Sequence, residues 1–107
     1  MKLPKVVANL VEAQNNYDSV AYANCFSETA TVFDENKIYK GRIEIQNWIS
    51  DANKKYKTVK KPINFVTNAT ESILSVEVSG EFEGSPVVLY YHFKIAEGEI
   101  QSLKITI

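Results

Sequence analysis

The sequence has few of the residues that mark disulfide-rich, fibrous or membrane proteins. Its single cysteine, Cys25, cannot form a disulfide within the chain, which fits a reducing compartment. Four glycines and three prolines are too few for a collagenous or linker-like chain. No run approaches the ~18 consecutive apolar residues of a membrane span, and residues 1–5 lack the apolar run of a signal peptide. We therefore expect a cytoplasmic protein with no membrane partner.

An excess of charge of either sign is also missing. The 12 Lys and Arg residues against 13 Asp and Glu residues give a formal net charge of −1, so no nucleic-acid partner is expected. Five lysines nevertheless lie close together: Lys54, Lys55, Lys57, Lys60 and Lys61. They suit either a phosphate-binding surface or a solvated helix end, where cations interact favourably with the helix dipole. The balanced charge of the rest of the chain favours the solvated helix end.

The residues that are present describe one ordinary globular domain over residues 1–107, with 45% hydrophobic and 23% charged residues. Apolar residues in the first half recur at intervals of three and four, which predicts three helices. The first follows Pro4, the second runs from Ser19 to about Phe26, and the third ends at about Lys57. A short extended segment at residues 30–39 precedes the third helix.

The second half of the chain changes to a period of two. From Pro62 onward apolar and polar residues alternate, as in half-buried antiparallel strands. Turn residues at 83–86 and 96–99 separate successive strands and predict a four-stranded meander. Helices followed by an antiparallel sheet predict the α+β class, with three N-terminal helices packed against the sheet.

Asp34 is the residue most suggestive of chemistry. In an extended segment it lies on the same face as Ala30 and Val32, so a buried face would direct its carboxylate into the interior. Burying a carboxylate without a partner costs several kcal/mol. Asp34 is therefore a general base with a raised pKa, a carboxylate paired with another group, or a solvated residue, as in a turn before Lys37.

Four segments resemble one known family. They are Tyr17-Asp18, then Phe26-Ser-Glu-Thr-Ala-Thr-Val-Phe-Asp34, then Tyr39-Lys-Gly-Arg42 with Ile45 and Trp48, and finally Phe93 to Ile100. In order and spacing they are similar to the SnoaL-like and nuclear transport factor 2-like superfamily, which includes ketosteroid isomerase and polyketide cyclases. The segments span nearly the whole chain. Because this superfamily is functionally broad, the resemblance indicates a fold more strongly than an activity.

The resemblance implies a highly curved, mainly antiparallel sheet that wraps around the three helices as a cone with a pocket at its open end. In isomerases of the superfamily, an aspartate placed like Asp34 removes a proton next to a carbonyl, and two donors hold the enolate oxygen. One donor position falls near Leu10, which cannot donate a hydrogen bond, and the other falls near Tyr91, a phenol. The Asp–Arg–Asp set of the epoxide hydrolase branch is not found in the sequence.

Other aromatic residues have two interpretations each. Tyr91 is either an oxyanion donor or a core residue with a satisfied hydroxyl. Trp48, Tyr56, Phe65 and Tyr17 are candidates to line the pocket, although aromatic residues at helical spacing more often belong to a core.

Tyr90 and His92 alternate with Tyr91 and are predicted on the outer face of the sheet, where many members of the superfamily form homodimers. His92 is the only histidine, which argues against a metal site. Cys25 lies on an apolar stripe and is interpreted as a core residue rather than a nucleophile. No cofactor is expected, because the sequence has no glycine-rich phosphate loop.

Two functional hypotheses follow. The first is a protein that binds a hydrophobic small molecule, as a SnoaL-like cyclase or isomerase with Asp34 as base and Tyr91 as donor. The second is a non-catalytic binding or dimerisation module, in which the outer face with Tyr90 and His92 is the important surface.

Overall fold

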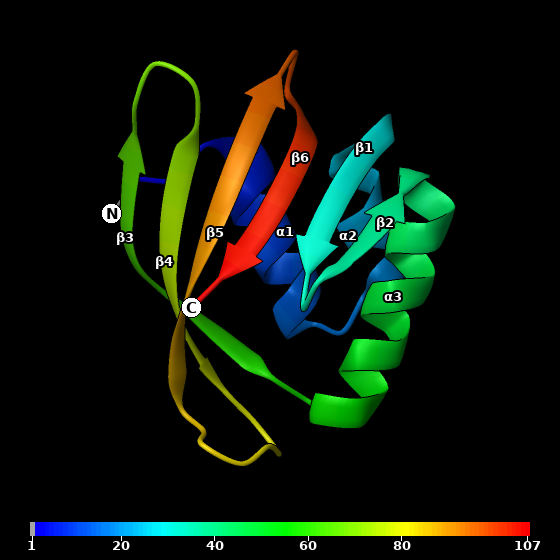
Figure 1. The fold of residues 1–107 in the computed structure, drawn as a ribbon, viewed down its shortest axis with the longest axis vertical. Coiled ribbons are helices and arrows are strands. Elements are labelled where there is room, and N and C mark those ends of the chain that lie inside the picture. The colour runs from blue at the N-terminus through cyan, green and yellow to red at the C-terminus, as the bar shows by residue number, and fades with distance from the viewer. Residues whose placement is uncertain (1) are drawn as a thin grey trace.

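One six-stranded sheet curves around three helices in the computed structural model, which describes residues 2–107 (Figure 1). The helices are α1 (Lys5–Asn15), α2 (Ser19–Asn24) and α3 (Gly41–Tyr56). The strands are β1 (Phe26–Asp34), β2 (Lys37–Lys40), β3 (Val59–Thr67), β4 (Ser72–Ser79), β5 (Val87–Ala96) and β6 (Glu99–Thr106). No helix among the described residues has the length and apolar content needed to cross a membrane.

The strand order β2-β1-β6-β5-β4-β3 joins the two halves of the chain into one sheet. Strands β3 to β6 form the predicted meander, with antiparallel neighbours throughout. Strand β1 pairs in parallel with β6, and β2 extends the sheet as its edge. The α+β class is therefore confirmed. The helices do not all precede the sheet, because β1 and β2 lie between α2 and α3.

The helix boundaries follow from local chemistry. Asp18 caps α2 by accepting a hydrogen bond from the backbone N–H of Ala21 at 3.0 Å. Helix α2 ends at Asn24, before the predicted end at Phe26, because Phe26 already belongs to β1 and pairs with Ile100 on β6.

Strand β3 starts earlier than the alternation predicts. It begins at Val59 rather than at Pro62, and Lys60 lies opposite Val78 on the inner face. The register then shifts between Pro62 and Asn64, so the bulge leaves Ile63 48% exposed. The interpretation of Lys60 as part of a solvated helix end is therefore wrong, because Lys60 is a strand residue with 8% exposure.

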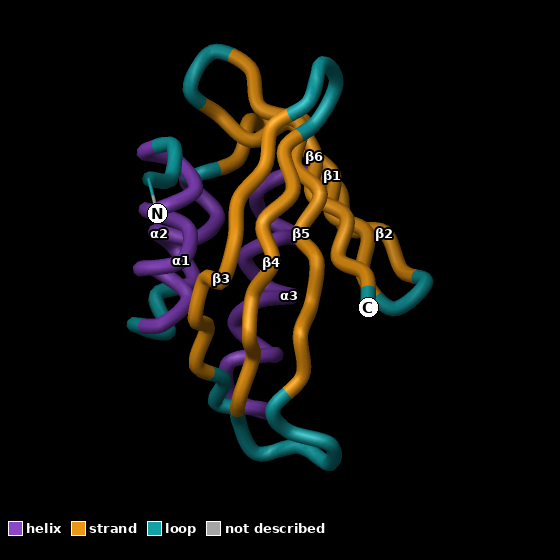
Figure 2. The backbone as a smooth tube through the Cα atoms, turned by 90° about the vertical axis from the view of Figure 1, so that its left-hand side faces the viewer, coloured by secondary structure: helices purple, strands orange, loops and turns teal. Residues whose placement is uncertain are grey.

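The hydrophobic core lies between the helices and the concave face of the sheet, and Figure 2 shows the helices gathered on that side. Each element contributes the side chains that its period predicts. Val7 and Leu10 come from α1, Ile45 and Ile49 from α3, and Leu74 and Val76 from β4.

Gly80 permits a close contact between the end of β4 and the end of α3. A Cβ atom at this position would lie 2.8 Å from the carbonyl oxygen of Tyr56 and 3.1 Å from the Cα of Thr58. The neighbouring N–H of Glu81 donates to the same Tyr56 oxygen at 3.0 Å. The chain after α3 is thereby held against the sheet where β3 begins.

Gly80→Ala should lower the free energy of unfolding by about 1–3 kcal/mol, because the added methyl group must displace backbone atoms. Urea denaturation measures this change. Ser79→Ala, at the neighbouring half-buried position, is the control and should stay within about 0.5 kcal/mol of wild type. Equal stability of Gly80→Ala and wild type would show that the two ends are not in contact.

Candidate functional site

A cavity of about 810 Å³ lies between the concave sheet face and helices α1 and α3. Its apolar wall combines α3 with the strands. The residues of this wall include Trp48, Ile49, Ala52, Val78, Phe82, Val87, Leu89 and Ile105. Its polar groups come from Gln14, Asp34, Asn53, Lys60 and Tyr91. An apolar cavity with a few converging polar groups is the usual form of a small-molecule site.

Asp34 ends β1 on the same face as the fully buried Val32, so the strand directs its half-buried carboxylate toward the cavity. Burial raises the pKa of Asp34 from 3.8 to about 6, and the negative charge of Glu35 contributes to the rise. The charge of Lys60 and a hydrogen bond with the Glu35 backbone act in the opposite direction. A carboxylate with a pKa near neutrality is suited to accept a proton and release it again.

Tyr91 places a phenol in the same cavity. It lies on β5 between Leu74 and Ile105 and is 2% exposed. Burial raises the pKa of Tyr91 far above its usual value, the charge of Asp34 raises it further, and the Gln14 side chain lowers it by hydrogen bonding. The phenol therefore stays protonated at neutral pH and can donate a hydrogen bond.

Lys60 is a site residue that the sequence reasoning missed. Its ammonium donates to the Thr58 hydroxyl at 3.1 Å. Burial lowers the pKa of Lys60 from 10.5 to about 8, against the effect of the Asp34 charge. Asn15 fixes the backbone at this point, because it accepts from the N–H of Lys60 at 2.7 Å and donates to its carbonyl at 3.0 Å.

Two of the four aromatic candidates line the cavity. Trp48 stacks on Tyr39 with 5.2 Å between ring centroids, and Tyr56 lies edge-on to Phe82 at 6.3 Å. The other two candidates do not line it. Phe65 packs against the hydrophobic core beyond the β3 bulge, and Tyr17 is 45% exposed in the connection between α1 and α2. Leu10 is fully buried in the core.

Tyr90 and His92 lie on the opposite face of the sheet from Tyr91. Tyr90 is 39% exposed. The His92 ring is 3.0 Å from the Thr106 hydroxyl through Nε2 and 3.5 Å from Glu71 through Nδ1. No group of three His, Cys, Asp or Glu side chains within residues 2–107 is arranged to hold a metal ion.

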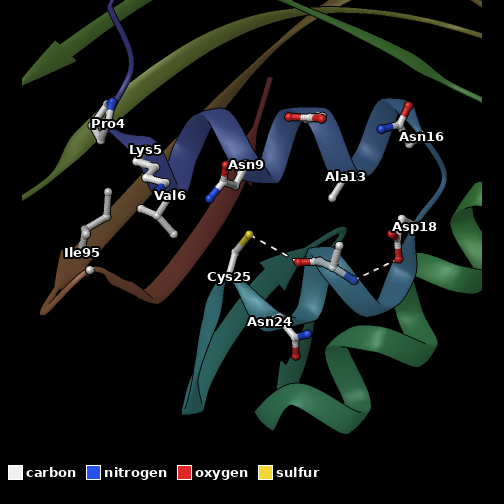
Figure 3. A pocket seen from close by; sticks show the side chains of 13 residues that line it. Pro4, Lys5, Val6, Asn9, Ala13, Asn16, Asp18, Asn24, Cys25 and Ile95 are labelled. Carbon is white, nitrogen blue, oxygen red and sulfur yellow. Dashed lines mark hydrogen bonds between the residues drawn. The ribbon is translucent and has the colours of Figure 1, made fainter.

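Cys25 lines a second cavity of about 680 Å³ between α1, α2 and the β5–β6 hairpin (Figure 3). Its thiol donates to the Ala21 carbonyl at 3.4 Å, and burial raises its pKa. Both effects favour the unreactive thiol over the nucleophilic thiolate. The chemically active groups therefore gather in the first cavity.

Comparison with known proteins finds solved structures with the same fold, and one of them is similar enough in sequence to show the family. The sequence matches no protein-family model and no curated protein. A candidate polyketide cyclase from Sinorhizobium meliloti is 33% identical with a TM-score of 0.92, over 97% of this chain and 95% of that chain.

More distant structures share the fold alone. A protein from Catenulispora acidiphila with a ketosteroid isomerase-like fold, solved with trimethylamine, has 15% identity and a TM-score of 0.87 over 99% of this chain and 87% of that chain. An epoxide hydrolase/cyclase-like enzyme of pyran-ring formation in salinomycin has 17% identity and a TM-score of 0.73, over 94% of this chain and 86% of that chain. The chain belongs to the SnoaL-like and nuclear transport factor 2-like superfamily, together with this candidate polyketide cyclase.

Proposed function

We propose that the larger cavity binds a hydrophobic carbonyl compound and that Asp34 removes a proton from the carbon next to the carbonyl group. The observation that supports this most directly is the placement of Asp34, with its pKa near 6, and the protonated Tyr91 phenol in one cavity. The first group can accept the proton, and the second can donate a hydrogen bond to the carbonyl oxygen as negative charge develops there.

The proposed reaction begins with ionised Asp34. The carboxylate takes the proton, the C–H electron pair moves into the enolate, and Tyr91 holds the enolate oxygen. Return of the proton to a different carbon gives an isomerase. Attack of the enolate carbon on a second carbonyl of the same molecule gives a cyclase, and Asp34 then returns its proton to the new alkoxide. The apolar wall around Trp48 and Ile49 would exclude water from both steps.

The relationships favour the cyclase branch of this proposal. The candidate polyketide cyclase matches 97% of this chain, and the salinomycin enzyme is described as epoxide hydrolase/cyclase-like. Cyclisation also suits the cavity of about 810 Å³, since such a volume can hold a folded chain of drug size.

A second proposal concerns the outer sheet face. Val88 and Tyr90 of β5 expose 40% and 39% of their surface, and Val66 of β3 exposes 50%. We propose that this face, with His92, forms a homodimer interface, whether or not the cavity is catalytic. A non-catalytic binding or dimerisation module is the alternative function in which this surface dominates.

Asp34→Asn should stabilise the protein at pH 7.5 and lose that advantage at pH 4. The raised pKa of about 6 against 3.8 means that the Asp34 contribution to stability is complete below pH 3.8 and is lost as the pH rises through 6. Two pKa units correspond to ~3 kcal/mol, and partial exposure reduces the expected gain to about 1–2 kcal/mol.

Urea denaturation at the two pH values measures this gain. Asp51→Asn, which removes an exposed carboxylate from α3, is the matched control and should stay within about 0.5 kcal/mol of wild type at both. A loss of stability in Asp34→Asn at pH 7.5 would mean that the carboxylate is solvated or paired.

Asp34→Asn should also slow the exchange of α-protons of 2-tetralone by at least ~100-fold, because the general base is removed. Tyr91→Phe should slow it by about 10–100-fold, because one oxyanion donor is lost. Proton NMR of the ketone in D₂O measures both rates, with Asp51→Asn as the control. For wild type, the rate should rise with pH around a midpoint near 6. Wild-type exchange no faster than buffer, or full activity in Asp34→Asn, argues against the proposal.

Tyr90→Lys should convert a wild-type dimer into a monomer, because a lysine charge would be buried at the interface. Sedimentation velocity measures the mass. Ile43→Lys, at a helical position with 79% exposure, is the control and should remain dimeric. A monomeric wild type, or a Tyr90→Lys variant that remains dimeric, would remove the outer face as the interface.

A further inference from the structure

We propose that the Lys60 ammonium is the recognition group of the larger cavity and that it selects ligands carrying an anionic oxygen. The inference rests on the proposed function for the location of the ligand. It adds the chemical class of that ligand and a further residue that contacts it.

The hydrogen bonds of Lys60 are incomplete. An ammonium group has three N–H donors, and the only side-chain partner of Lys60 within residues 2–107 is the Thr58 hydroxyl at 3.1 Å. The residue is 8% exposed, so water can compensate little. A buried cation with two unused donors costs several kcal/mol unless another group accepts from it. Because Lys60 lines the cavity, a bound molecule can be that acceptor.

Asp34 does not fill this role directly. Each residue shifts the pKa of the other through its charge, yet no ion pair joins them in the described part of the chain. Both residues line the same cavity, so a ligand bound there can lie against both. An anionic oxygen held by Lys60 would leave a neighbouring C–H bond of the ligand available to Asp34.

The backbone keeps Lys60 from turning into solvent. Asn15 of α1 bonds both the N–H and the carbonyl of this residue, at 2.7 and 3.0 Å. Helix α1 therefore fixes the start of β3 with Lys60 on the inner face, opposite Val78.

Lys60 differs from the other lysines near the cavity. Lys37 also lines it but is exposed, so it would hold an anion only weakly. Lys104 is exposed too, and it pairs with His92 on the outer face of the sheet. Only Lys60 is buried, and a charge-assisted hydrogen bond from a buried donor is the stronger kind.

Two kinds of ligand could present an anionic oxygen to Lys60. The anionic oxygen is either a carboxylate that the ligand already carries or an enolate formed when a proton leaves. A shape-matched pair separates charge from hydrophobic contact: cyclohexanecarboxylate carries the anion, and cyclohexanecarboxamide is neutral. 4-Nitrophenol represents the enolate, because its visible absorption shows whether it is bound as the phenolate.

The test measures equilibrium binding at pH 7 by the fluorescence of Trp48, which is the only tryptophan and lines the cavity. Wild type should bind the carboxylate at least ~10-fold more tightly than the carboxamide. Lys60→Met, similar in length but uncharged, should reduce this preference to about twofold or less. Lys104→Met removes an exposed lysine that lies opposite His92 on the outer face, and it should keep the preference. Asp34→Asn should bind the carboxylate more tightly, because a like charge is removed.

Equal wild-type affinity for the two ligands, saturable binding of neither, or an unchanged preference in Lys60→Met would overturn the inference. The first comparison needs no variant, so it stands even if Lys60→Met does not fold. Binding of 4-nitrophenol as phenolate at pH 6 would extend the recognition to enolates, whereas binding as the neutral phenol would restrict it to preformed carboxylates. These equilibria are independent of proton exchange, so a failure of the proposed catalysis would be seen separately, in the 2-tetralone assay.

Discussion

Two opposite charges share an apolar cavity without forming an ion pair, and the rest of the site depends on that arrangement. Asp34 is half-buried and Lys60 is buried, and burial moves the pKa of each toward neutrality. A direct contact would return both pKa values toward their usual range and close the space between the groups. Held apart, they leave one group able to accept a proton and another able to hold an anion.

The fold sets the positions of Asp34 and Lys60 through strand order and backbone contacts. Asp34 lies at the end of β1, and Lys60 lies at the start of β3, at the far edge of the same curved sheet. The sheet curves between the two strands (Figure 2), and both residues line one cavity. The hydrogen bonds of Asn15 and the close contact at Gly80 position the chain where β3 begins.

The sequence alone predicts the positions of Asp34 and Tyr91 in this site. The alternation of Ala30, Val32 and Asp34 predicts the direction of the carboxylate, and the alternation along β5 separates Tyr91 from Tyr90 and His92. Period and turn residues also predict the α+β class and the four-strand meander. These features depend on residues that are close together in the sequence, so the local sequence pattern predicts them.

The positions of Lys60 and Phe65 depend on long-range contacts, which the local sequence pattern does not predict. Lys60 follows the lysine-rich end of α3 in the sequence. Its burial arises from pairing with Val78, which lies 18 residues later. The bulge after Pro62 shifts the following residues, and Phe65 packs against the core instead of the cavity. The position of β1 beside β6 is likewise a tertiary result, since 64 residues of the chain lie between the end of β1 at Asp34 and the start of β6 at Glu99.

The electrostatic coupling of Asp34 and Lys60 can be measured directly by carbon-detected NMR titration of the Asp34 carboxylate in wild type and in Lys60→Met. The wild-type pKa should be about 6, and it should be higher in Lys60→Met, because the lysine charge lowers it. A pKa near 3.8 in wild type, or no increase in Lys60→Met, would contradict the view that the two charges share one cavity.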